Sequence, residues 1–300
     1  MNIKTTNTAP IYVRLMGGLG NQLFQYSTAR TLADARGTDL VLDARYVVRK
    51  AQHTGLALEA FDIRATVLAE SSQRHFPETK IKWAKWFKRY YRPMFNIFCE
   101  TSLGVDSQLV AQPNGSMLLG FWQSEQYFSH NKLLPKDLVL KQPLSGKALE
   151  ISQSIQKKES VALHVRRGDY VNNSKALKRY GLCSVDYYQK AIEHLSQHLT
   201  DPHFYVFSDD PKWVLEHLSM PGQCTFVSAK DIAPEQDLIL MSQCKHQIIA
   251  NSTFSWWGAW LNSHCDKIVV YPAPWFDEQA INANDLVPHS WHPIAKNSTT

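Results

Sequence analysis

The residues best suited to chemistry stand at the end of a short apolar run, in the segment His164-Val165-Arg166-Arg167-Gly168-Asp169. Side chains alternate along a strand, so the odd positions from 161 to 165 should face one way and His164 and Arg166 the other. Arg166 would then lie at the strand's carboxyl end, where its guanidinium fork suits a phosphate. Gly168 permits a sharp turn that brings Asp169 back to the same point. An Arg–Asp pair that only fixes this turn is the structural alternative.

A second polar cluster, Asn251-Ser252-Thr253-Phe254-Ser255, separates an apolar run from a tryptophan-rich helical pattern. The start of a helix presents unpaired N–H groups and a partial positive charge, and hydroxyls add further donors. The pattern therefore predicts an anion site. N-capping by Asn251 or Ser252 is the simpler interpretation, but a cap needs only one such residue.

Asp209 is a third candidate, in the segment Phe207-Ser208-Asp209-Asp210-Pro211. Proline favours the first position of a helix, so Asp210 is the expected N-cap. Asp209 is then left without a local partner. A carboxylate at a strand's end can accept hydrogen bonds from ribose hydroxyls or a purine, although a solvated turn residue would look the same.

A glycine loop, Gly17-Gly18-Leu19-Gly20, precedes Asn21 and Gln22 and would let a ligand approach the backbone closely. The dinucleotide fingerprint G-x-G-x-x-G is incomplete, because its third glycine position is occupied by Leu23. Asp43 stands at the end of the next expected strand, where a ribose-binding acid would lie. The loop is therefore a weak signal for a nicotinamide cofactor.

These residues require an α/β scaffold, and the hydropathy pattern predicts one. Strands are expected at 11–16, 39–43, 117–121, 161–166, 204–208, 224–227, 247–250 and 267–271, and helices at 21–36, 142–158, 185–199, 211–218, 235–244 and 255–264. Regular alternation implies mostly parallel sheets that bind ligands at the carboxyl ends of their strands. We expect an N-terminal domain over 1–150 and a C-terminal domain over 151–300, with extended linker at 135–143.

Composition narrows the class of protein. The chain has 300 residues, 44% hydrophobic and 20% charged, which is enough for a sizeable core. A net charge of +5 suits anionic ligands but is too small for duplex nucleic acid. No apolar stretch is long enough to span a bilayer. The cysteines form no CxxC pair and the histidines lack ligand spacing, so we expect reduced thiols and no metal site.

The segment 80–92 combines aromatic and basic residues at helical spacing. As a helix it would place Trp83 and Phe87 on one side and Lys85 and Arg89 on another. Such a helix can rest on an anionic membrane surface. A helix packed on its own domain, with a solvated basic face, is the competing interpretation.

Together, four segments resemble the α-1,2-fucosyltransferases of glycosyltransferase family 11. They are 17–22, 164–169, 208–210 and 251–258, in the family's order and spread over nearly the whole chain. The resemblance implies an α/β fold of two Rossmann-like domains in a GT-B-like architecture. It also implies inverting, metal-independent transfer of L-fucose from GDP-β-L-fucose to O2 of a terminal β-galactose.

The resemblance also implies roles for individual residues. The donor GDP-fucose, with no cofactor besides, would be bound by the C-terminal domain through His164, Arg166, Arg167, Asp209, Asn251, Ser252, Thr253 and Ser255. The acceptor side in the N-terminal domain would include Gly18, Asn21 and Gln22. The catalytic residues would be Arg166, as a phosphate clamp, and a base that takes the acceptor's proton. Asp169 is the first candidate for this base, His164 the second, and Asp43 a third.

The resemblance further implies a bacterial, cytoplasmic enzyme, with 80–92 as a possible contact to the inner membrane. The acceptor stays open among lactose, N-acetyllactosamine and Galβ1,3 ends. The residues by themselves also allow another nucleotide-sugar transferase, a nicotinamide-dependent oxidoreductase or a non-catalytic glycan-binding module. Binding of GDP rather than NAD, and release of GDP from a sugar donor, distinguish these classes.

Overall fold

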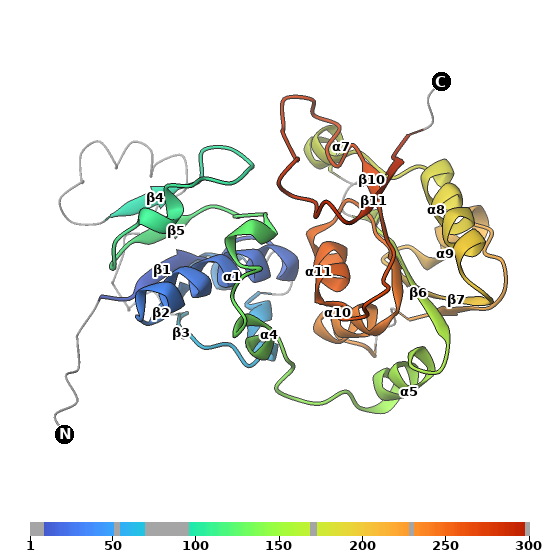
Figure 1. The fold of residues 1–300 in the computed structure, drawn as a ribbon, viewed down its shortest axis with the longest axis horizontal. Helices are drawn as coiled ribbons and strands as arrows, with labels where there is room; N and C mark the ends of the chain where they lie inside the picture. The colour runs from blue at the N-terminus through green and yellow to red at the C-terminus, as the bar shows by residue number, and fades with distance from the viewer. Residues whose placement is uncertain (1–8, 51–54, 70–95, 169–172, 228–230, 298–300) are drawn as a thin grey trace. The chain divides into compact units, whose positions relative to one another are not determined.

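The computed structural model (Figure 1) describes residues 9–50, 55–69, 96–168, 173–227 and 231–297. The chain divides into two compact units, and each is described by itself. The first comprises residues 1–141 and 284–287, and the second comprises 142–283 and 288–300. The chain thus enters the second unit before residue 150. Residues 284–287 return to the first unit, where Asp285 accepts a hydrogen bond from the Val105 amide (2.9 Å).

The first unit contains a five-stranded sheet with the strand order β3-β2-β1-β5-β4, in which every neighbouring pair is parallel. Its strands are β1 (Ile11–Arg14), β2 (Leu40–Asp43), β3 (Thr66–Leu68), β4 (Ile97–Cys99) and β5 (Met117–Leu119). Its described helices are α1 (Leu19–Arg36), α2 (Arg45–Lys50) and α4 (Leu134–Asp137), with 3₁₀ turns η1 (Ala57–Ala60), η2 (Leu109–Ala111) and η3 (Glu125–Tyr127).

Helix α1 begins directly after the glycine loop and ends where the sequence predicted. Gly37 is left-handed (φ 60°), and its amide donates to carbonyls of the last turn. A left-handed residue at this position is the usual glycine C-cap. Most of α1 is buried, including the carboxamides of Gln22 and Gln25. Those polar side chains must find partners inside the unit, and this requirement shapes the loops around them.

The second unit contains a six-stranded sheet with the order β11-β10-β9-β6-β7-β8, again with parallel neighbours throughout. Its strands are β6 (Glu159–Val165), β7 (Pro202–Ser208), β8 (Cys224–Phe226), β9 (His246–Ile248), β10 (Val269–Ala273) and β11 (His292–Ala295). Its described helices are α5 (Gly146–Ile155), α7 (Ser174–Tyr180), α8 (Val185–His198), α9 (Pro211–His217), α10 (Pro234–Gln243) and α11 (Thr253–Leu261).

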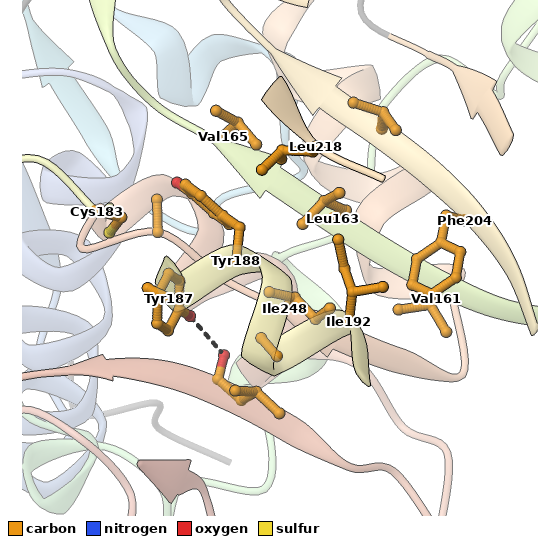
Figure 2. Packing of buried hydrophobic residues seen from close by; sticks show 14 of the residues in the cluster. Val161, Leu163, Val165, Cys183, Tyr187, Tyr188, Ile192, Phe204, Leu218 and Ile248 are labelled. Carbon is orange, nitrogen blue, oxygen red and sulfur yellow. Dashed lines mark hydrogen bonds between the residues drawn. The ribbon is translucent and has the colours of Figure 1, made fainter. Parts of the chain in front are cut away.

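Helices cover both faces of this second sheet. On one face, Val161, Leu163 and Val165 of β6 pack against α8, as Figure 2 shows. On the opposite face, Ala162 packs with residues of α5 and α10. The predicted alternation along β6 is therefore confirmed. The Tyr187 hydroxyl of α8 donates to the Ile249 carbonyl (2.6 Å) and so ties this helix to the end of β9.

Several segments differ from the sequence-based expectation, which did not include strands β3 and β4 or helix α2. The expected linker at 135–143 contains the short helix α4, and Leu140 forms a β-bridge with Phe61. Strand β11 was not predicted because it contains Pro293, which is tolerated only on an edge strand. Helix α7 was not predicted because its sequence, SKALKRY, lacks an apolar stripe.

Candidate active site

The strand order of the second sheet reverses at β6. The chain proceeds from β6 to β7 and β8 on one side, whereas β9 pairs with β6 on the other. Residues Val165 and Ser208 are paired, as are Leu163 and Ile248. The segments that follow these strands, beginning at Arg166, Asp209 and Ile249, therefore leave the same edge at neighbouring positions. In doubly wound sheets ligands bind at this switch point.

Arg166 is the first residue beyond β6, and 31% of its side chain is exposed. Its Nη1 lies 3.3 Å from Oδ2 of Asp209. The same carboxylate accepts from the Arg167 amide (2.9 Å) and the Gly168 amide (3.1 Å). Arg166 is thus a partly exposed cation in a fixed loop.

Asp209 is the residue that fixes this loop. The sequence interpretation left it without a local partner, and its partners are indeed distant in sequence, because it accepts from main-chain amides of a loop 41 and 42 positions away. A Cβ on Gly168 would lie 3.1 Å from its Oδ2, which accounts for glycine there. Asp210 caps α9 through the Trp213 amide, as predicted.

Arg167 is directed toward α9. Its guanidinium carbon lies 4.0 Å from the centre of the Trp213 ring, and its Nε lies 3.8 Å from a carboxylate oxygen of Asp210. Stacking on the indole and an opposite charge both stabilise this position. Of the two predicted phosphate-binding arginines, Arg166 is therefore the more exposed, with 31% of its side chain accessible against 20% for Arg167.

His164 is buried on the same face of β6 as Ala162, and its ring centre lies 5.8 Å from that of Phe254 in the first turn of α11. Burial and the neighbouring charge of Arg166 lower the pKa of His164 to about 3. Its Nδ1 is buried without a hydrogen-bond partner among the described residues. A neutral imidazole with such a low pKa is a poor general base, but its unpaired nitrogen is well suited to a ligand hydrogen bond.

Only part of the predicted anion cluster can face a ligand. Ser252 caps α11 by accepting from the Phe254 amide (3.3 Å), and it and Thr253 are partly exposed. Ser255 is completely buried, and its hydroxyl donates to the Ala250 carbonyl (3.2 Å). Its hydroxyl is therefore engaged within the fold, and its predicted contact with phosphate stays a prediction.

Asn251 also differs from its predicted role. It is buried, and its amide donates to the carbonyls of Tyr180 (2.7 Å) and Trp275 (3.2 Å). The buried ammonium of Lys296 donates to the same two carbonyls and pairs with Asp277. Asn251 therefore positions loops, together with Lys296, which the sequence analysis did not single out.

The predicted acceptor-side residues lie at the start of α1. Gly18 is the N-cap, with open space where a Cβ would stand, whereas a Cβ on left-handed Gly17 (φ 77°) would overlap Asn21. Asn21 is partly exposed and accepts from Gln123 (2.8 Å). Gln22 is buried and donates to the Gly17 and Gly55 carbonyls, so its carboxamide is engaged within the unit. Its place on the acceptor side stays a prediction.

Asp43 is unavailable as a base or a ribose ligand. It is completely buried between Arg14 (2.9 Å) and Arg45 (2.7 Å). Burial alone would raise the pKa of Asp43, but the hydrogen bonds and charges of Arg45 and Arg14 outweigh it and hold the pKa below its usual value. This third candidate for the base, and with it the acid of a nicotinamide site, is therefore wrong.

Some predictions fall on segments outside the described residues, namely Asp169 and the basic segment 80–92. Within the described ranges, no group of three or more histidine, cysteine or acidic side chains is arranged to hold a metal ion. Helices of that same part of the chain include none that is long and apolar enough to cross a membrane.

Two units, each with a parallel α/β sheet, are the architecture of the GT-B-like class of proteins. The fold is shared with the fucosyltransferase NodZ from Bradyrhizobium, at a TM-score of 0.51 and 16% identity, over 85% of this chain and 94% of that one. The chain belongs to glycosyl transferase family 11, whose model matches residues 3–295.

Sequence relatives agree with the family. The chain is 35% identical to an α-1,2-colitosyltransferase of Escherichia coli, over 95% of this chain and 99% of the relative. It is 32% identical to the O-antigen biosynthesis glycosyltransferase WbnK of the same species, over 94% and 99%. A galactoside α-(1,2)-fucosyltransferase 1 of Alouatta caraya is 25% identical over 82% of this chain and 63% of that protein. A nicotinamide enzyme or a non-catalytic lectin is thereby set aside.

Proposed function

We propose that this chain transfers L-fucose from GDP-β-L-fucose to O2 of a terminal β-galactose, with inversion and without a metal ion. Membership of family 11 and the α-1,2 linkage in the names of relatives support the reaction type. The observation that supports binding of the donor, GDP-fucose, is the switch point of the second sheet. There Arg166, the unpaired Nδ1 of His164 and the start of α11 belong to adjoining segments.

Charge stabilisation is the main task of these residues. Negative charge grows on the β-phosphate as its bond to fucose breaks, and fixed donors that face this charge lower the barrier. Arg166 supplies a permanent cation. The first turn of α11 supplies amide groups that have no acceptor within the helix, together with the hydroxyls of Ser252 and Thr253. Arg167 and Asp209 hold the Arg166 loop, and Asp209 keeps a lone pair that could serve guanosine.

The acceptor hydroxyl attacks the anomeric carbon from the face opposite the nucleotide, in a single displacement through an oxocarbenium-like state. A base that removes its proton typically contributes about 10²–10⁴-fold. We assign this role to Asp169, because Asp43 is buried in an ion pair and the pKa of His164 is about 3. His164 instead offers a neutral hydrogen bond to the donor.

Colitose is the second candidate for the transferred sugar, because a relative with 35% identity is named for it. Colitose is L-fucose without the 3-hydroxyl, so the two donors differ by one polar group. A site built to hydrogen-bond a hydroxyl discriminates strongly against the analogue that lacks it, whereas an apolar pocket barely distinguishes the two.

The test supplies the purified full chain with GDP-fucose or GDP-colitose and with lactose, N-acetyllactosamine or a Galβ1,3 acceptor. GDP release is measured by a coupled assay and the product linkage by NMR. We expect GDP release from GDP-fucose and an α-1,2-linked product. A preference for GDP-colitose of about 10²-fold or more would identify the second candidate. No acceptor-dependent GDP release from either donor would refute both.

A further inference from the structure

The first sheet also has a switch point, between β1 and β5. Strand β1 pairs with β2 on one side and with β5 on the other. Because β1 and β5 are parallel neighbours, labelled in Figure 1, the segment 15–21, which runs into α1, and the loop 120–124 leave the same edge of the sheet at neighbouring positions. By the rule that located the donor residues, this edge is a second place to look for a ligand.

The loop after β5 is held in a strained conformation. Trp122 has a φ of 57°, in the left-handed region that bulky residues avoid. The Glu100 carboxylate accepts from the Phe121 amide (2.7 Å) and the Trp122 amide (2.9 Å). The Trp122 ring is buried and stacks on Phe98, with ring centres 5.7 Å apart. Strain of this kind persists only where its surroundings enforce it, and it clusters at functional sites.

The consequence of this turn is the placement of the neighbouring side chains. Trp122 and Ser124 are buried, whereas Phe121 and Gln123 are partly exposed. Gln123 Nε2 donates to Oδ1 of Asn21, in the first turn of α1 (2.8 Å). The strained backbone thereby presents a carboxamide that reaches the loop after β1.

The carboxamides at this edge fall into two kinds. Gln22 and Gln25 are buried, and both ends of each are used on main-chain groups of the surrounding loops. Asn21 and Gln123 are bonded to each other. Within the described residues, no protein acceptor engages Asn21 Nδ2 and no protein donor engages Gln123 Oε1. The pair thus offers one amide donor group and one carbonyl acceptor to a ligand. Exchanging the oxygen and nitrogen positions of both amides leaves the same two groups.

This chemistry fits a neutral sugar. A sugar hydroxyl can accept from one amide and donate to the other, and Phe121 adds an apolar surface for the C–H face of a pyranose ring. Neither loop 15–21 nor loop 120–124 contains a charged residue. A nucleotide phosphate would be poorly stabilised there, in contrast with the surroundings of Arg166. We propose that Gln123, paired with Asn21, hydrogen-bonds a hydroxyl of the acceptor galactose other than the reacting O2. This inference rests on the proposed function.

The test is a cycle between enzyme and acceptor variants. Gln123→Ala is compared with the wild-type chain on a β-galactoside and on its 3-, 4- and 6-deoxy analogues. We expect the acceptor KM to rise about 3- to 10-fold, as for one neutral hydrogen bond, with kcat and the donor KM nearly unchanged. One deoxy acceptor should be affected much less by the substitution, because the contact is already missing. A merely structural effect would lower kcat/KM by the same factor for the parent acceptor and all three deoxy analogues.

Two further variants complete the design. Gln108→Ala removes an exposed glutamine of the same unit and is expected to match the wild type. Gln123→Asn keeps a carboxamide on a shorter side chain. It replaces Gln123→Ala in the same assays if the alanine variant unfolds at a lower temperature than the wild type. A raised donor KM with an unchanged acceptor KM, or equal effects on every deoxy acceptor, would overturn the assignment.

A binding measurement separates this inference from the proposed function. Ligand-observed NMR with methyl β-D-galactoside and GDP reports acceptor binding without turnover. If the wild-type chain binds the galactoside through Gln123 but transfers no fucose, the proposed function fails and the subsite stands. If it transfers fucose but Gln123→Ala binds the galactoside as tightly, the subsite fails alone.

Discussion

Replacement of His164 by phenylalanine should make the protein less sensitive to acid. The ordinary pKa of histidine is 6.5, and burial beside Arg166 lowers that of His164 to about 3. Above pH 6.5 the imidazole is neutral in both folded and unfolded chains. Between pH 6.5 and pH 3 only the unfolded chain takes up the proton, so this group makes stability fall as the pH falls.

The magnitude follows from the same linkage. At pH 5 the unfolded histidine is mostly protonated and the folded one is not, which costs about 2 kcal/mol relative to pH 7.5. Any pKa below about 4 in the folded chain gives the same result. The pKa in the unfolded chain then determines the change in the free energy of unfolding between pH 7.5 and pH 5. Phenylalanine keeps a ring against Phe254 but cannot titrate, so His164→Phe should recover about 2 kcal/mol of this loss.

The assay is urea unfolding at pH 7.5 and pH 5, followed by tryptophan fluorescence. The described tryptophans other than Trp122 lie in the second unit, so the signal reports mainly on the unit that holds His164. His130→Gln removes an exposed histidine as a control. Equal losses of stability in the wild type and His164→Phe would refute the claim that His164 is held neutral. A fall of kcat/KM below about pH 6.5 in the wild type that is absent only from His164→Phe would also refute this claim.

The remaining predictions concern the Arg166 loop, a packed glycine and the metal. Arg166→Ala should lower kcat about 10²–10³-fold without unfolding the chain, since Asp209 keeps its two main-chain partners; near-normal turnover would remove the phosphate clamp. Asp209→Asn should raise the KM for GDP-fucose more than it lowers kcat, because the loop loses an acceptor and Arg166 its counter-charge; an unchanged KM would contradict this. Gly181→Ala should cost about 2 kcal/mol or more in thermal unfolding, because the new Cβ would overlap the Asp277 carboxylate. Gly146→Ala, also left-handed but in open space, should cost only about 1 kcal/mol; equal costs would show that overlap is irrelevant. Transfer should be unaffected by EDTA, and recovery of a chelated, inactive enzyme by Mn²⁺ would contradict metal-free catalysis.

The sequence predicted the scaffold because strands and helices leave periodic signals. The alternation in β6 placed Val161, Leu163 and Val165 on one face, and the glycine that ends α1 was recognised from its type alone. Strand β11 left no such signal, because an edge strand with an exposed pattern and a proline lacks apolar periodicity.

The site was harder to predict because the same polar residue types bind ligands and hold loops. Asn251, Ser255 and Gln22 carry the groups that a phosphate or sugar would need, yet each is buried and engaged by the main chain. Which way such a side chain points depends on carbonyls contributed by distant segments, such as Trp275 for Asn251. Spacing along the chain does not contain that information.

A comparison of two arginines shows how position decides function. Arg14 ends β1 and Arg166 follows β6, so both stand at the carboxyl end of the strand beside a switch point. In the first sheet, the last residue of the adjacent strand is Asp43, and its carboxylate is buried between Arg14 and Arg45, so Arg14 is held inside the fold. In the second sheet, Asp209 lies one residue beyond its strand, so Arg166 pairs with it while still 31% exposed. The two pairs share one register, because Arg14 is paired with Asp43 and the pairing of Val165 with Ser208 places Arg166 beside Asp209. The second pair lies one residue beyond the ends of its strands, and there the partly exposed Arg166 suits the nucleotide diphosphate that we propose as its ligand.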